Sequence, residues 1–167
     1  MTVRNICLGA MALSAILTAP ALAKQGKVGL WNVTSTTEMA LPPKDAATMK
    51  AAGQSLPAAK PVTVQMCMSQ AEVDSSHPPH LDPGSTGCTT RTTKQTASEM
   101  TAEMSCNGNM KGGGNIRITY TGNEHYVGSY TFKGTSFGAA ANITTNFKGD
   151  WVKADCGKVQ PYKLRTQ

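Results

Sequence analysis

The sequence lacks the short motifs by which many enzyme families are identified. It contains no G-x-S-x-G, no H-E-x-x-H, and no glycine-rich loop followed by Lys and Ser or Thr, as a nucleotide phosphate site requires. We therefore interpret Gly112-Gly113-Gly114 as a flexible turn. Glu124 and His125 could form an acid–base pair, but neighbours along a strand face opposite ways. We predict a protein that is not an enzyme and uses no cofactor.

A membrane-spanning segment is also missing. Crossing the apolar layer of a bilayer takes about 20 apolar residues, and the mostly apolar run over residues 6–18 is too short. That run follows Arg4 and precedes Ala21-Leu22-Ala23, the small-residue pattern of a signal-peptide cleavage site. We expect a signal peptide over 1–23, cleavage after Ala23, and a mature chain 24–167 that is periplasmic or secreted.

Acidic residues are few, and basic residues are not clustered. The chain has 16 Lys and Arg against 10 Asp and Glu, a net charge of +6. Nucleic-acid-binding proteins usually gather their basic residues on one patch or stripe, and no such run occurs here. The distribution argues against a nucleic-acid partner. Contact with anionic surfaces of the cell envelope stays open.

No C-x-x-C pair occurs, which argues against a zinc ribbon or a thioredoxin-type redox site. Cys7 falls within the expected signal peptide, so the mature chain has four cysteines, Cys67, Cys88, Cys106 and Cys156. An even number of cysteines in an exported chain indicates two disulfides, for which three pairings exist.

Long helical periodicity is absent, whereas threonine-rich segments bounded by Gly and Asn are frequent. This pattern is typical of short antiparallel strands. We predict an all-β fold, a single domain of about seven or eight antiparallel strands in an open barrel-like meander or a two-layer sandwich. The expected strands cover 28–39, 61–68, 88–96, 99–106, 116–121, 125–133, 141–147 and 151–156, with turns at Asn107-Gly108, Gly122-Asn123, Lys133-Gly134 and Lys148-Gly149-Asp150.

The connecting segments give two further expectations. Flexible loops are predicted near 41–60 and 74–87, the first with a weak helical turn over 45–52. Ser69 is followed three residues later by Glu72, which matches a capping box at the start of a short helix.

The stretch "VQMCMSQ", residues 64–70, places a cysteine between two methionines. These three sulfur atoms could bind a soft metal such as Cu(I) if they converged. Successive side chains of a strand point to opposite faces, so Cys67 lies opposite the row Val62, Val64, Met66 and Met68. We expect that row to face the core, and Cys67 to form a disulfide.

The register of one hairpin indicates which cysteines pair. If Cys88 lies opposite Cys106, paired residue numbers sum to 194, and Arg91 meets Glu103. Opposite charges then face each other across the hairpin, which is favourable. The same register places Thr93 opposite Thr101 and Gln95 opposite Glu99. We predict a Cys88–Cys106 disulfide and, by elimination, Cys67–Cys156.

Several segments together resemble a known family. An export signal is followed by "GLWNVTSTTEM", by "MSQAEV" after Cys67, by a cysteine pair flanking a hairpin, and by "GDWVKADCG". This order and spacing resembles the bacterial exported family called domain of unknown function 3617, over most of the mature chain. Asn32 stands where that family usually has Glu, and residues 39–43 replace a Met-Pro-Gly loop. The resemblance implies secretion and the fold type, with no catalytic residues.

Two histidines form the most site-like stretch. Pro78 and Pro79 separate His77 from His80, and Asp82 follows. Two imidazoles and a carboxylate could bind Zn or Cu(II). Two prolines hold the backbone extended at about 3.1 Å per residue, which sets the histidines about 10 Å apart. They are weak candidates, and we predict no metal site.

Three functional hypotheses follow. The first is a non-enzymatic binding or interaction module whose partner is a protein of the cell envelope. The second is a carrier that holds a small apolar ligand in a barrel-like pocket, against Trp31, Trp151, Met66 and Met68. The third is a periplasmic copper binder that uses methionine and histidine.

Overall fold

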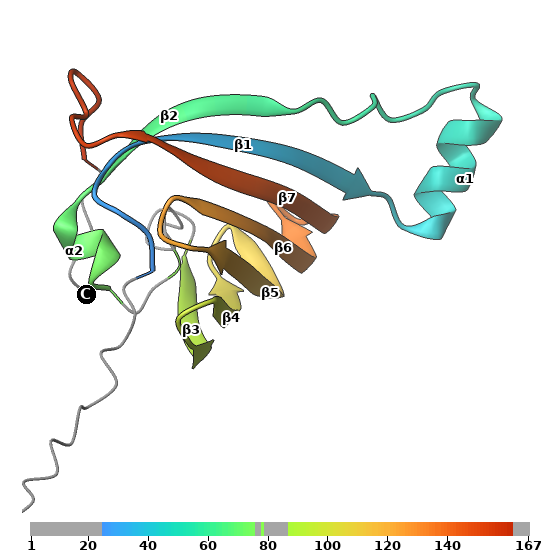
Figure 1. Cartoon of the computed structure of the whole chain (residues 1–167). Coiled ribbons are helices and arrows are strands. Elements are labelled where there is room, and N and C mark those ends of the chain that lie inside the picture. The colour runs from blue at the N-terminus through green and yellow to red at the C-terminus, as the bar shows by residue number, and fades with distance from the viewer. Residues whose placement is uncertain (1–24, 76–77, 79–86, 162–167) are drawn as a thin grey trace, which may run out of the picture.

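The computed structural model describes residues 25–75, 78 and 87–161. These residues form one open antiparallel sheet of seven strands in the order β2-β1-β7-β6-β5-β4-β3 (Figure 1). The predicted all-β class is confirmed, and of the two predicted architectures the open meander is the observed one. The elements are β1 (Gly29–Ala40), α1 (Pro43–Ala51), β2 (Val62–Met68), α2 (Gln70–Val73), β3 (Cys88–Gln95), β4 (Glu99–Asn107), β5 (Met110–Thr121), β6 (His125–Ser136) and β7 (Ala139–Lys153).

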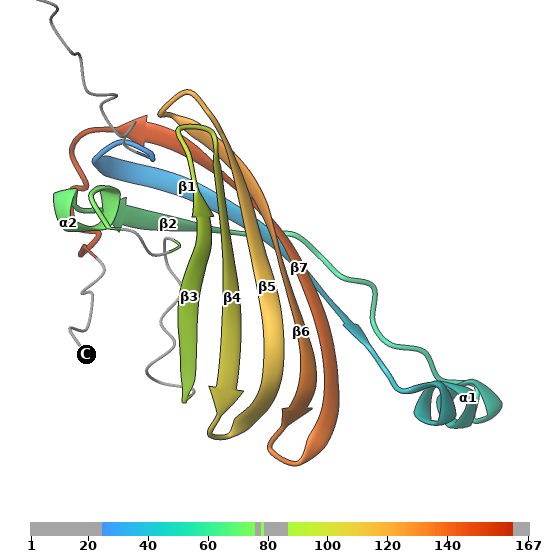
Figure 2. The ribbon, with the colours of Figure 1, turned by 90° about the horizontal axis from the view of Figure 1, so that it is seen from below.

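The sheet is strongly curved (Figure 2). One of its faces, called the inner face here, carries the core. Trp31 and Ile118 are fully buried there, and Val73 of α2 belongs to the same cluster. Alternate residues of each strand point to this inner face, and those between them form the polar outer face. Burying one large apolar side chain contributes roughly 1.5–3 kcal/mol. The remaining buried members of the main cluster are Met68, Met100, Ala102, Ile116, Tyr120 and Tyr126.

Three of the sequence-based turns are wrong, because the strands run longer than expected. Gly112-Gly113-Gly114 lies inside β5, Lys133-Gly134 inside β6, and Lys148-Gly149-Asp150 inside β7. At Gly112, Gly114, Gly134 and Gly149 an atom of the neighbouring strand lies too close for a side chain, whereas Gly113 has more room. A Cβ atom on Gly114, for example, would lie 2.1 Å from the carbonyl oxygen of Thr131.

The turn between β6 and β7 is Phe137-Gly138, which the sequence analysis did not identify. Ser136 pairs with Ala139, so the loop has two residues, and both have positive φ, 48° and 84°. Tight hairpins of this kind favour Asn-Gly or Gly-Gly. A left-handed backbone costs roughly 1–2 kcal/mol for a residue with a side chain like that of Phe. The Phe137 N–H donates to Asn109 O, 2.9 Å away, at the neighbouring β4–β5 turn.

The expected core row on β2 is only half correct. Met68 is buried and Met66 is partly buried, but Val62 and Val64 are 58% and 48% exposed. β2 is an edge strand that pairs with β1, and α2 covers only its Met68 end (Figure 1). The Val62 end leads back to α1, which has no buried residue. The predicted weak helix near 45–52 is therefore present as α1, apart from the core.

Both predicted disulfides are present. Cys67–Cys156 joins residues 89 apart in sequence, and Cys88–Cys106 joins residues 18 apart. The predicted hairpin register is correct for Cys88 opposite Cys106 and Arg91 opposite Glu103. A bulge between Thr92 and Lys94 then shifts it, so Gln95 lies opposite Met100 and not Glu99.

The capping box and the connecting segments complete the fold. Ser69 caps α2, and its backbone N–H donates to Glu72 Oε2 at 2.7 Å. Most of the loop expected near 74–87 lies outside the described residues, as does the expected signal peptide. In the described part of the chain, no helix is both long and apolar enough to cross a membrane.

Candidate functional site

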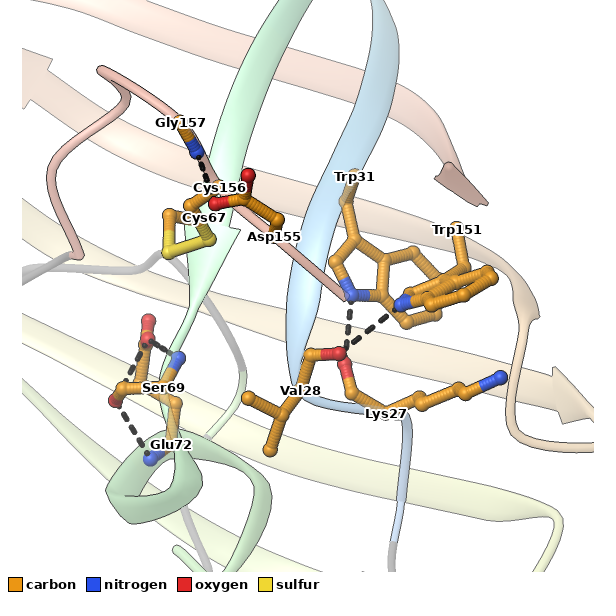
Figure 3. The surroundings of a disulfide bond; sticks show 10 residues. All are labelled: Lys27, Val28, Trp31, Cys67, Ser69, Glu72, Trp151, Asp155, Cys156 and Gly157. Atoms are coloured by element: carbon orange, nitrogen blue, oxygen red, sulfur yellow. Dashed lines mark hydrogen bonds between the residues drawn. A yellow bond between two sulfur atoms is a disulfide. The ribbon is translucent and has the colours of Figure 1, made fainter. Parts of the chain in front are cut away.

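The four side chains expected to hold an apolar ligand lie together at one end of the inner face. Trp31 of β1 pairs with Met66 on one side and with Trp151 of β7 on the other. Met68 packs in the same cluster. The four residues are therefore neighbours in space, and Figure 3 shows the two tryptophans side by side.

Both indole N–H groups are bonded to the segment just before β1. Trp31 Nε1 donates to Lys27 O at 2.8 Å, and Trp151 Nε1 donates to Val28 O at 3.0 Å (Figure 3). The Lys27 ammonium lies 3.7 Å from the centre of the Trp151 ring and 2.6 Å from Glu124 Oε1. The Lys27 ammonium holds the pKa of Glu124 below its usual value.

This cluster packs as part of the fold. Trp31 is 0% exposed and Met68 is 2% exposed, so neither presents surface to a ligand in this structure. Trp151 is partly exposed, but a cation already covers one face of its ring. Ligand binding by Trp31, Trp151, Met66 and Met68 stays a prediction, and the packing role is what the structure supports.

The sulfur atoms of residues 66–68 do not act together. Met66 and Met68 pair with residues of the inner face, and Cys67 between them points to the opposite face by strand alternation. Cys67 is bonded to Cys156 (Figure 3). A disulfide sulfur is not the thiolate that a soft metal binds. Among the described residues, no group of three or more His, Cys, Asp or Glu side chains is arranged to hold a metal. His77 and His80 lie outside those residues.

Glu124 and His125, the acid–base pair considered in the sequence, bind different partners. Glu124 binds Lys27, and His125 Nδ1 lies 3.0 Å from Asp150 Oδ1. The two members of the sequence pair Glu124-His125 thus have different partners, in agreement with strand alternation. Burial raises the pKa of Tyr130 to about 12 and also raises the pKa of Tyr120 above its usual value. Those phenols stay protonated near neutral pH.

The outer face has a broad, open depression of about 550 Å³. Its two cations have partners: Arg117 lies 2.9 Å from Glu99, and Lys148 lies 3.7 Å from Asp150. Four of its lining side chains carry hydroxyl groups, and the depression is open to solvent, so it does not enclose a ligand as the barrel-like pocket of the carrier hypothesis would. Its lining side chains are Thr34, Thr36, Arg117, Thr119, Val127, Ser129, Asn146, Phe147 and Lys148.

The two edges of the sheet differ in their protection. Natural edge strands avoid pairing with other chains by means of charged side chains and bulges. β3 has both, namely Arg91, Lys94 and the bulge at Thr93. β2 has no charged residue and no bulge against β1, and its residues 62–65 are exposed. Within the described chain, β2 pairs with β1, and at its Met68 end Cys67 makes an isolated bridge to Pro161 and a disulfide with Cys156.

The fold and its two disulfides define the class as a disulfide-stabilised open antiparallel sheet in which one edge strand, β2, carries neither charged residues nor a bulge. A family model described as protein of unknown function (DUF3617) matches residues 26–156, and the chain belongs to this family. The resemblance inferred from the sequence motifs is thereby confirmed. No curated protein and no solved structure matches the chain.

Some features of these surfaces were missed by the sequence analysis. The role of Lys27 depends on its proximity to Trp151 and Glu124, which are 124 and 97 residues away along the chain. No local pattern indicates such a contact. The exposed β2 edge had a signal that could have been used, since no charged residue occurs between Lys60 and Glu72.

Proposed function

We propose that the protein is an exported, non-enzymatic interaction module that binds an extended segment of a partner protein along the edge of β2. The observation that supports this is the contrast between the two sheet edges. β3 is blocked by charge and by a bulge, whereas β2 presents uncharged, exposed backbone over residues 62–65. Strand addition to an open sheet edge is a recurring mode of peptide recognition.

The side chains of β2 define what such a segment would contact. Val62 and Val64 are 58% and 48% exposed and project to the same face. Thr63 lies on the other face, where its hydroxyl is 2.8 Å from that of Thr34. A partner strand would bond the main chain and place alternate apolar residues beside the two valines. The occupant expected from this chemistry is an uncharged segment of alternating β-branched residues.

Export is supported by the N-terminal pattern and by the two disulfides. Disulfides persist in oxidising compartments outside the cytosol. Intact-mass analysis of the protein from its host should find a chain that begins at Lys24. A full-length chain with free thiols would contradict export.

The edge itself is tested with a blocked peptide of alternating Val and Thr. We expect saturable binding, with slower hydrogen exchange at the β2 amides. Val64→Lys should weaken binding by about tenfold or more, because a charge on an edge strand disfavours strand addition. The same peptide methylated on alternate backbone nitrogens should not bind, because it cannot donate to the edge.

A matched variant makes the test specific. Thr89→Lys places the same charge on the other edge strand, at an exposed position of β3, and should leave binding unchanged. Equal losses in Val64→Lys and Thr89→Lys would point to a general charge effect and contradict the assignment to β2. Wild-type protein that fails to bind the unmethylated peptide would also contradict it.

A further inference from the structure

Phe137, at the tip of the β6–β7 hairpin, combines an unfavourable backbone conformation with an exposed aromatic ring. Phe137 has a positive φ, where Asn or Gly would be favoured. Its ring is 83% exposed, whereas Phe132 is 2% exposed in the core. The ring therefore adds almost no burial to the fold in return for an unfavourable backbone. An unfavourable backbone conformation that is not offset by packing indicates a role in binding and not in folding.

On β5, β6 and β7 the charged side chains near this tip are two lysines, and the acidic Glu38 of β1 lines the same depression as one of them, Lys133. Lys111 of β5 pairs with Thr135, which lies two residues before Phe137. Lys133 of β6 lies two residues before Thr135. Both lysines project to the outer face, about 7 and 13 Å from the turn at roughly 3.3 Å per residue. No Asp or Glu occurs between Glu103 and Glu124, or between Glu124 and Asp150.

The opposite end of the same strands has acidic residues. Glu99 begins β4, Glu124 lies in the β5–β6 turn, and Asp150 pairs with His125 at the start of β6. The hairpins are therefore polarised, with acidic groups at one end and an aromatic tip flanked by lysines at the other. Ala40, the last residue of β1, pairs with Asn142, so α1 leaves the sheet near the Phe137 end (Figure 2).

We propose that the Phe137 tip docks on the surface of an anionic phospholipid bilayer. The ring would enter the boundary between headgroups and acyl chains, where aromatic side chains are favoured. The ammonium groups of Lys111 and Lys133 would contact lipid phosphates. One ring and two cations give weak, reversible binding that neither spans the membrane nor requires the β2 edge.

Phe137→Asn separates docking from folding. Asn tolerates positive φ better than Phe, so this variant should unfold at the same temperature as the wild type or higher. The probe is sedimentation of the full mature protein with vesicles of phosphatidylcholine containing one third phosphatidylglycerol. We expect Phe137→Asn to lose most of the vesicle-bound fraction. Lys111→Gln and Lys133→Gln should each lower the partition coefficient about fivefold, the factor for one cation at an anionic surface.

Matched controls decide the outcome. Val127→Asn removes an apolar side chain that is 57% exposed on the outer face of β6, and it should bind vesicles as the wild type does. Val64→Lys should also bind, which separates this site from the proposed peptide edge. Equal binding to pure phosphatidylcholine, or unchanged binding of Phe137→Asn, would overturn the proposal. So would a wild type that leaves the vesicles unbound, the result expected if Phe137 instead fits a protein pocket.

Discussion

Gly149 lies directly opposite Tyr126 in the β6–β7 ladder, and the Tyr126 ring covers it. A Cβ atom on Gly149 would lie 2.2 Å from two carbons of that ring. Gly128 and Phe147 repeat the relationship two pairs further along, on the same face, with a closest approach of 2.5 Å. Glycines at these positions let large rings lie flat on the inner face of a curved sheet.

Gly149→Ala should therefore destabilise the protein. The added methyl group forces the Tyr126 ring out of its position, and such overpacking costs about 1–3 kcal/mol. Urea unfolding gives the change in the free energy of unfolding. Gly113→Ala is the control, because its Cβ atom meets only the Met104 carbonyl oxygen, at 3.3 Å. That variant should change stability by no more than about 0.5 kcal/mol, and equal losses would show that the ring is not the cause.

The same glycines explain what the sequence could predict and what it could not. Gly112-Gly113-Gly114 and Lys148-Gly149-Asp150 have the composition of turns, and local chemistry assigns them so. In the folded chain, atoms of the neighbouring strand leave no room for a side chain at Gly112, Gly114 and Gly149, and those atoms belong to residues that are distant in sequence. The Cys88–Cys106 register was predictable because it depends on one hairpin with a charge pair as a check. The predicted register is wrong only beyond the bulge at Thr93, and no residue pattern in the sequence predicts that bulge.

For the candidate binding surfaces as well, the sequence predicted what depends on one strand and not what depends on distant parts of the chain. Alternation along β2 correctly separated Met66 and Met68 from Cys67, because it depends on one strand alone. It did not predict that Val62 and Val64 are exposed, because that depends on where α2 ends its cover of the sheet. Phe137 was missed because an aromatic residue is not among the usual turn formers.

Removal of each disulfide should lower stability by different amounts. In the loop-entropy model, closing a longer loop restricts the unfolded chain more. The Cys67–Cys156 link spans 89 residues and Cys88–Cys106 spans 18. Double Cys→Ala substitution should then cost about 4.5 kcal/mol for the first pair and about 3 kcal/mol for the second. Urea unfolding of the two variants measures the difference.

Loss of native packing could make removal of Cys88–Cys106 more costly than removal of Cys67–Cys156. Cys67, Cys88 and Cys106 are all buried, so their side chains also contribute contacts. A larger loss for the Cys88–Cys106 pair would show that native packing, and not the entropy of the unfolded chain, sets the effect. Intact mass under non-reducing conditions serves as the control that the remaining disulfide has formed in each variant.

Glu72 should give the protein a pH-dependent stability. Its side chain is 6% exposed, and burial raises its pKa above the ordinary value of 4.5, although two hydrogen bonds from Ser69 act in the other direction. A carboxyl group with a raised pKa binds its proton more tightly in the folded chain than in the unfolded one. Between the two pKa values the folded state holds more protons, so the free energy of unfolding falls as pH rises through that interval.

Glu72→Gln isolates this contribution, because the amide oxygen can still accept from the Ser69 N–H and does not titrate. Relative to this variant, the wild type should lose stability as pH rises from about 4.5, and the difference should level off above the folded-state pKa. Urea unfolding at a series of pH values measures it. Ala71→Ser, an exposed change on the same helix, should differ from the wild type by a constant amount. A Glu72→Gln difference that is equally constant, or that favours the wild type at higher pH, would show that hydrogen bonds at the cap outweigh the burial of the carboxyl group.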